Sequence, residues 1–238
     1  MAAAVLLACA LSVQAEHQDY NARIKYIPLD GEASLSESLN GEWNFKLNGP
    51  AQEFFKAGFD DSKWDKITVP GNWEAQWFIK PSYREPTEAE GLYRRSFAVP
   101  KDWQGKEIFI RFEGVAFGFE FWIDGQRAGS FASAYNRSDF DITEYVKPGQ
   151  EQTLAVRVYQ TPKGHEFDHN DDWGLSGIHH DVLLFAVSKT HVADLTVTTD
   201  VARDLSKGTV DCTIETGSFG FKGGNAELEA ALISPTGE

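Results

Sequence analysis

The feature that most constrains this chain is a succession of short apolar segments with alternating polarity, which begins at Leu39. Successive side chains of a half-buried strand point to opposite faces, so this alternation indicates β-strands. Asp124-Gly125 is a hairpin signal, and Pro148-Gly149 precedes another such segment. No stretch of about 12 residues has a convincing helical stripe. The strongest predicted strands are LNGEWNFKL, KITVP, GLYRRSFAVP, EIFIRFEGV, GFEFWIDGQ, TLAVRVYQ and HDVLLFAV.

Many short antiparallel strands without intervening helices predict an all-β fold, namely a jelly-roll β-sandwich. A closed barrel is compatible with the same pattern. Aromatic residues make up 13% of the chain, which supports a β-rich fold. We expect two closing sheets to bury a layer of aromatic side chains such as Phe45, Phe109, Phe121 and Trp122. Trp43 and Trp73 are also expected to be buried.

A second unit is expected from residue 191, where HVADLTVTTDV, GTVDCTIETG and NAELEAALIS have the pattern of further strands. An immunoglobulin-like sandwich needs about 100 residues, and residues 191–238 supply about half of that length. We therefore predict a jelly roll over residues 16–190 and a partial immunoglobulin-like sandwich over 191–238. Since half a sandwich leaves a bare edge and an uncovered face, the sequence is expected to be a fragment of a longer protein.

Residues 1–15 are apolar and carry no charged side chain, and small residues precede a plausible cleavage after Ala15. This pattern is typical of a signal peptide and predicts export to the periplasm or the extracellular space. The basic segment of such a peptide is missing, which is compatible with a start further upstream. Cys9 offers a lipoprotein-like alternative. After cleavage only Cys212 remains, so no internal disulfide is expected.

The formal net charge of -14 argues against nucleic acid as a partner, because an acidic surface repels phosphates. The apolar stretch at the start is too short to span a membrane.

The polar segment 164–181, GHEFDHNDDWGLSGIHHD, holds most of the chemistry that resembles a site. Carboxylates and amides accept sugar hydroxyls, and an indole stacks on the apolar face of a sugar. Clustered oxygens also suit a hard cation, although the segment matches neither an EF-hand loop nor a HExxH zinc site. A solvated acidic loop explains the same residues, so composition leaves the segment undecided. His179 and His180 alternate, so one should face inward and the other outward.

The string DDWGLSGIHHDVLL resembles a segment of the family 2 glycoside hydrolases, in which an Asp and an aromatic residue precede a (Ser/Ala)-Gly-Ile core. Other parts agree with this family in order and spacing over about residues 37–190. They are LNGEWNFKL, ITVPGNWEAQ, and GLYRRSFAVPKDWQGKEIFIRFEGV followed by FEFWIDGQRAGS.

The resemblance implies a jelly roll, then an immunoglobulin-like domain, then a catalytic (β/α)₈ barrel that is absent from this sequence. Members of this family hydrolyse terminal β-linked sugars with retention, and both carboxyl groups sit on the barrel. No residue of this chain is therefore assigned a catalytic role. The expected partners are a carbohydrate substrate and the barrel of the same polypeptide, and a homo-oligomer is compatible with the family.

The resemblance also implies that the first domain contacts the terminal sugar through an Asp five residues before Ser176, which is Asp171. Asn170, Asp172 and Trp173 are further candidates for substrate binding. In some β-galactosidases this carboxylate also helps to hold a monovalent cation, so a monovalent or divalent cation near Asp171 is the one cofactor considered.

The chain departs from β-galactosidases in residues 77–91, where we find no match for an Asn that touches galactose. Tyr83 and Arg84 of this loop are candidates for lining a pocket. Two alternatives stay open beside a β-galactosidase-like enzyme. One is a non-catalytic carbohydrate-binding module, and the other is a purely structural interaction domain.

Overall fold

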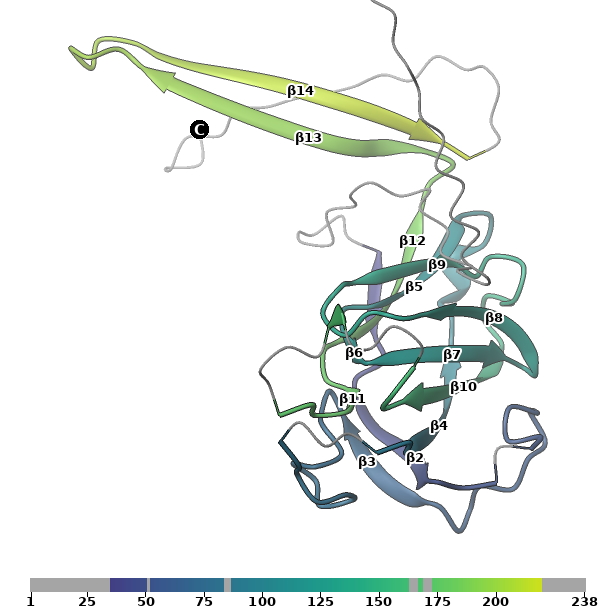
Figure 1. Ribbon diagram of the computed structural model, residues 1–238. Helices are drawn as coiled ribbons and strands as arrows, with labels where there is room; N and C mark the ends of the chain where they lie inside the picture. Colours follow the sequence, from purple (N-terminus) through teal and green to yellow (C-terminus); the bar gives the residue numbers. More distant parts are fainter. Residues whose placement is uncertain (1–34, 51, 84–86, 163–166, 169–172, 220–238) are drawn as a thin grey trace, which may run out of the picture.

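The computed structural model describes residues 35–50, 52–83, 87–162, 167–168 and 173–219 (Figure 1). Two antiparallel sheets face each other as a sandwich, one with strand order β1-β12-β5-β9 and the other with β3-β2-β4-β10-β7-β8. Small two-stranded sheets are formed by β11-β6 and by β13-β14. The predicted all-β sandwich is therefore confirmed, and the described residues contain no α-helix.

The strands of the four-stranded sheet are β1 (Ser36–Ser38), β12 (Val182–Val187), β5 (Glu107–Phe112) and β9 (Ser138–Asp141). Those of the six-stranded sheet are β3 (Asp65–Val69), β2 (Gly41–Leu47), β4 (Glu90–Ala98), β10 (Glu151–Tyr159), β7 (Gly118–Ile123) and β8 (Gln126–Phe131). The remaining elements are β6 (Val115–Ala116), β11 (Gly177–Ile178), β13 (Thr190–Val201), β14 (Gly208–Ser218) and the 3-10 helix η1 (Lys101–Trp103).

The turn predicted from Asp124-Gly125 joins β7 to β8. Both residues have positive φ angles, 48° and 85°, as a type I′ hairpin requires. Glycine adopts this conformation without strain, and Asp tolerates it better than most residues. The turn thereby sets the pairing of Ile123 with Gln126.

The main core lies between the two large sheets. Phe45 and Phe121 are fully buried there, and Phe121 contacts Phe112, Phe119 and Phe140 through tilted or edge-to-face ring pairs. Such arrangements are the favoured geometry of aromatic pairs. The predicted burial of Trp43, Trp73 and Trp122 is also confirmed.

The expectation that Phe109 and Trp122 share this layer is wrong. Trp122 follows Phe121 directly in β7, so its side chain points to the outer face, where it packs on Phe54 and Phe55. Phe109 likewise points out of the four-stranded sheet and stacks on Phe185 at a centroid distance of 5.3 Å. Both outer faces of the sandwich are thus partly covered.

After β12 the chain leaves the sandwich and forms the long hairpin β13-β14, which extends away from it (Figure 1). The hairpin falls in the region predicted to start an immunoglobulin-like sandwich. Its membership of such a domain stays a prediction, and NAELEAALIS lies outside the described residues. In the part of the chain that the structure describes, we find no helix long and apolar enough to cross a membrane.

Candidate functional site

Segments far apart in the sequence meet beside β6 and β11. The turn after β3 donates a hydrogen bond from Gly71 N to the Ile178 carbonyl at 2.8 Å, and Trp73 N donates to the Ser176 carbonyl at 2.9 Å. Gly177 lies between these bonds with a φ of +118°, and a Cβ on it would lie 2.9 Å from the Gly71 carbonyl oxygen. The approach of the two segments therefore requires glycine at position 177.

A buried carboxyl group stabilises the contact between the turn after β3 and the segment that contains Ser176. Glu74 is 3% exposed and accepts a hydrogen bond from Ser176 N at 2.9 Å. Gln160 Nε2 lies 3.5 Å from the other Glu74 oxygen. Burial raises the pKa of Glu74, although the hydrogen bonds from Ser176 oppose this shift. Glu74 thus ties the segment before β11 to the end of β10.

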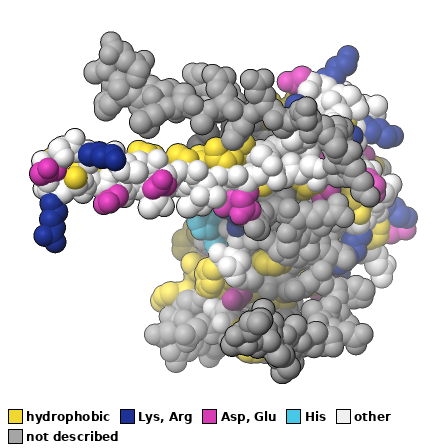
Figure 2. All heavy atoms as spheres, turned by 90° about the horizontal axis from the view of Figure 1, so that it is seen from above, with side chains coloured by type: hydrophobic (Ala, Val, Ile, Leu, Met, Phe, Trp, Pro, Cys, Tyr) yellow, Lys and Arg dark blue, Asp and Glu magenta, His cyan; other side chains and the backbone are white. Residues whose placement is uncertain are grey.

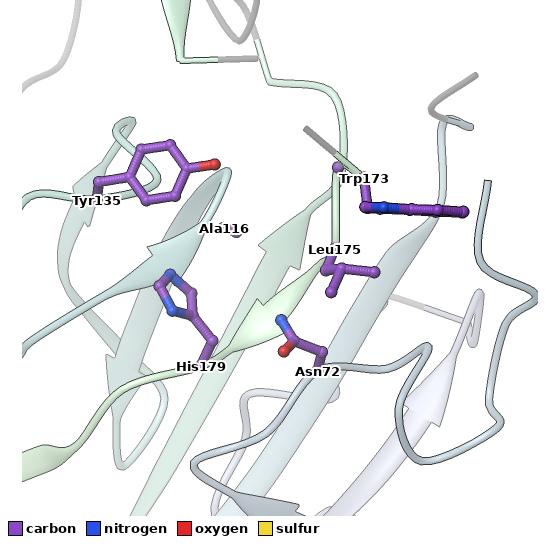
Figure 3. A pocket seen from close by; sticks show the side chains of 7 residues that line it. Asn72, Ala116, Tyr135, Trp173, Leu175 and His179 are labelled. Atoms are coloured by element: carbon purple, nitrogen blue, oxygen red, sulfur yellow. The ribbon is translucent and has the colours of Figure 1, made fainter. Parts of the chain in front are cut away.

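A pocket of about 470 Å³ opens where these segments meet (Figure 3). Its lining combines aromatic and aliphatic side chains with an amide and an imidazole. The lining residues are Asn72, Ala116, Tyr135, Trp173, Gly174, Leu175 and His179. A concave, mostly apolar site with a few converging polar groups is typical of small-ligand pockets.

The turn that carries Tyr135 is held by hydrogen bonds to both backbone groups of Ala134. Asp168 Oδ2 accepts a hydrogen bond from Ala134 N at 2.6 Å. His179 Nε2 lies 2.9 Å from the Ala134 carbonyl oxygen, so this nitrogen carries a proton and donates it. In the same turn Asn136 Nδ2 donates to Ser133 Oγ at 2.8 Å.

Burial lowers the pKa of His179, and the neighbouring His180 lowers it further, so the imidazole is neutral near pH 7. Gly114 lets the two histidines approach the backbone, because its carbonyl accepts from both of their N–H groups at 3.2 Å. A Cβ at Gly114 would lie 2.9 Å from each imidazole. His179 is half-buried and His180 is exposed, as the alternation predicted.

Of the predicted site residues, the structure describes Trp173. It is 57% exposed, lines the pocket and makes an edge-to-face contact with Tyr83 at a centroid distance of 5.5 Å. Tyr83 comes from the loop that was expected to contribute to a pocket. Asn170, Asp171, Asp172 and Arg84 lie outside the described residues, so their roles stay predictions.

The cation expected near Asp171 stays a prediction for the same reason. Among the described residues, no group of three or more His, Cys, Asp or Glu side chains is placed to hold a metal ion.

Most of the pocket lining is not indicated by the sequence. Asn72 follows β3 and Tyr135 lies between β8 and β9, and no sequence pattern marks either residue as part of a site. The alternation of the two histidines indicated that one of them faces inward, without indicating that it borders a pocket.

Comparison with known proteins identifies a family and several relatives of this chain. Residues 36–188 match the family described as glycosyl hydrolases family 2, sugar binding domain. A β-galactosidase of Halalkalibacterium halodurans is 34% identical over 204 residues, which are 76% of this chain and 20% of that protein. A β-galactosidase of Priestia megaterium is 31% identical over 194 residues, which are 72% of this chain and 19% of that protein. The chain thus spans about a fifth of the length of these curated relatives.

Solved structures agree on the fold. A β-glucuronidase of an uncultured Clostridium species superposes with a TM-score of 0.64 at 25% identity, over 82% of this chain and 36% of that one. A β-glucuronidase of Bacteroides uniformis gives a TM-score of 0.61 at 22% identity, over 77% of this chain and 26% of that one.

The family match covers both sheets of the sandwich and the segments that line the pocket. The chain therefore belongs to glycosyl hydrolase family 2, and residues 36–188 are its sugar-binding domain.

Proposed function

We propose that this chain is the N-terminal part of a β-galactosidase-like enzyme, which removes terminal β-linked sugars from oligosaccharides with retention of configuration. The observation that carries the proposal is the family match over residues 36–188 together with β-galactosidases at 31–34% identity. The β-glucuronidases resemble the chain at 25% identity or less, so they bear on the fold more than on the sugar.

In this proposal the two carboxyl groups of the retaining mechanism come from a catalytic barrel of the same polypeptide. One carboxyl group protonates the leaving oxygen, and the other attacks the anomeric carbon. The sandwich contributes binding and orientation: Asp171, with Asn170 and Asp172, accepts hydroxyl groups of the terminal sugar, and Trp173 offers an aromatic face. The exposed ring of Trp173 at the pocket supports this assignment.

The test uses the whole product of the gene and compares hydrolysis of a nitrophenyl β-galactoside with that of a nitrophenyl β-glucuronide. We expect the galactoside to be the better substrate. Asp171→Asn should lower kcat/KM about 10- to 100-fold, because a charge-assisted hydrogen bond to the sugar is weakened. Asp204→Asn, an exposed change in the turn between β13 and β14, is the matched control.

Faster hydrolysis of the glucuronide would overturn the choice of galactoside. Sugar binding without hydrolysis of any β-glycoside would favour the non-catalytic carbohydrate-binding module. An Asp171→Asn enzyme as active as its control would remove Asp171 from the site.

We also propose that the protein is exported, since residues 1–15 have the pattern of a signal peptide. N-terminal sequencing of the mature protein should begin at Glu16. A mature protein that retains residues 1–15 contradicts this proposal.

A further inference from the structure

The turn after β3 pairs with the segment before β11 over a short distance, and a side chain ends this pairing. Gly71 N donates to the Ile178 carbonyl at 2.8 Å. Two residues further along, Trp73 N donates to the Ser176 carbonyl at 2.9 Å. The next donor of the segment is Ser176 N, and Glu74 Oε2 accepts its hydrogen bond at 2.9 Å. The Glu74 carboxyl group thus takes the place of a backbone carbonyl where the pairing ends.

The other oxygen of this carboxyl group faces the side chain of Gln160. Gln160 Nε2 donates to Glu74 Oε1 over a long distance of 3.5 Å. At the other end of the Gln160 amide, Oε1 accepts from Thr87 N at 2.8 Å and from Thr87 Oγ1 at 2.6 Å. A backbone N–H can only donate, so it must face the amide oxygen. The amide nitrogen of Gln160 must therefore face Glu74.

Thr87 and Ser176 belong to two segments that also meet at the surface. Thr87 lies in the stretch before β4, and Ser176 lies in the stretch before β11. Tyr83 of the first stretch and Trp173 of the second are exposed and make an edge-to-face contact, with their centroids 5.5 Å apart. The two segments are therefore joined twice, once by exposed rings and once by a buried carboxyl–amide pair.

This carboxyl–amide pair is fixed to the six-stranded sheet. Gln160 directly follows β10, and its N–H donates to the Ala89 carbonyl at 3.0 Å, next to the start of β4. Thr161 Oγ1 donates to the Thr87 carbonyl at 3.3 Å. Glu74 and Gln160 are 3% and 5% exposed, so solvent has little access to their polar groups. Because an unmatched buried donor or acceptor is costly, the placement of both segments depends on this pair.

Position 74 requires a carboxylate for this arrangement, because both of its partners donate. Ser176 N and Gln160 Nε2 each bring a proton, and a carboxylate offers an acceptor oxygen to each of them. An amide at the same position would offer one oxygen and one NH2 group, so one of the two donors would meet another donor. The two donors thus explain why an acidic side chain is buried here.

We infer that Glu74 and Gln160 are positioning residues that hold the segments before β4 and before β11 in place relative to each other. Neither side chain is among those that line the described pocket, so each acts through the backbone that it holds. The inference rests on the proposed function in its kinetic consequence: in a β-galactosidase-like enzyme, a disturbed pair weakens substrate binding.

The test exchanges the two side chains in the whole product of the gene. In Glu74→Gln a donor meets the Gln160 amide nitrogen, and in Gln160→Glu a second carboxylate meets the first. We expect each single variant to show faster amide hydrogen exchange in peptides that include Thr87 or Ser176. In Glu74→Gln/Gln160→Glu the amide donates and the carboxylate accepts, so exchange in both segments should return to that of the parent.

The same variants should separate KM from kcat in the hydrolysis of a nitrophenyl β-galactoside. Each single variant should raise KM about fivefold and change kcat less than about twofold, because substrate binding is weakened equally in the ground and transition states. The double variant should regain a KM within about twofold of the parent. Glu120→Gln is the matched control and should leave KM unchanged, since the Glu120 carboxylate accepts from Arg127 and Tyr159 instead.

A double variant whose exchange is no closer to the parent than that of the worse single variant overturns the inference. So does Glu74→Gln with the exchange of the parent in both segments. If Gln160→Glu alone does not fold, recovery of a folded protein in the double variant supports the inference, and failure to recover it overturns it.

Lower kcat at unchanged KM contradicts a positioning role in substrate binding. The exchange measurement needs no substrate, so it decides the inference even where no galactoside is hydrolysed. Absence of hydrolysis by the parent counts against the proposed function alone.

Discussion

The sandwich of residues 36–188 and the hairpin β13-β14 are built from the same alternation of apolar and polar residues, yet they bury their apolar sides very differently. In the sandwich, the second sheet covers the apolar face of the first, and Phe121 is 0% exposed. In the hairpin, Leu195 pairs with Ile214 and Val197 with Cys212. These residues share one face, and Val197 is 52% exposed.

Figure 2 shows hydrophobic side chains gathered in a row along the hairpin. The opposite face is polar, with Thr196 paired with Thr213 and Thr198 with Asp211. The comparison teaches that alternation specifies which face of a strand is apolar, whereas burial depends on what packs against that face. It also implies that the same kind of substitution has very different effects in the two regions.

The largest effect is expected in the main core. Phe121→Ala should lower the free energy of unfolding by about 3–5 kcal/mol, because it removes a ring that packs on several others and leaves a cavity. Urea denaturation followed by tryptophan fluorescence measures this change. A loss below about 1 kcal/mol would contradict the described core.

The next largest loss of stability is expected at Gly177, where the backbone of β11 closely approaches the turn after β3. Gly177→Ala should cost about 1–3 kcal/mol, since its positive φ and its closeness to Gly71 leave no room for a Cβ. Gly58→Ala is the matched control, because no atom lies within 4 Å of the added Cβ. Equal stability of the two variants in thermal denaturation would show that the turn does not approach β11 as described.

A smaller effect is expected from pH, and His179 contributes to it in the sandwich, as His191, whose pKa burial also lowers, does in β13. The fold holds the pKa of His179 below its ordinary value of 6.5, so the unfolded chain takes up a proton first as the pH falls. Stability should therefore fall as the pH drops through that ordinary value. The loss between about pH 7.5 and about pH 5.5 should shrink in His179→Gln and persist in His180→Gln. The same slope in both variants would assign the pH effect to other groups.

The smallest effect is expected in the hairpin. Val197→Thr should change the unfolding free energy by less than about 0.5 kcal/mol, because the side chain already faces solvent. The measurement is the same urea denaturation, and Phe121→Ala serves as its reference. A cost comparable with that of Phe121→Ala would mean that a partner surface covers this face in solution.

The sequence predicted the long strands well and the short ones poorly. In β10, Leu154, Val156 and Val158 alternate, so its periodicity is clear, and β4 and β12 are long enough to be recognised as apolar-rich runs. β6 and β11 have two residues each, which is too short for any periodicity, and their pairing depends on contacts between distant segments. The same limit explains the misplaced Phe109 and Trp122, since apolar side chains on both faces of a strand hide which face is the inner one.

The candidate site was predictable only where its residues are continuous in the sequence. Trp173 lies in a segment that resembles the family and does line a pocket. Asn72 is brought to the same pocket by the hydrogen bond between Gly71 and Ile178. Tyr135 is brought there by the hydrogen bond between Ala134 and Asp168. Such contacts join residues about a hundred positions or tens of positions apart, and a linear pattern does not contain them.

The most direct test of the central claim is amide hydrogen exchange of the intact protein with and without methyl β-D-galactopyranoside. The account predicts slower exchange with sugar in peptides that cover residues 71–73, 133–136 and 173–179, and unchanged exchange in β13 and β14. No protection in the sandwich peptides, or protection confined to the hairpin, would contradict the assignment of the sugar site to this pocket.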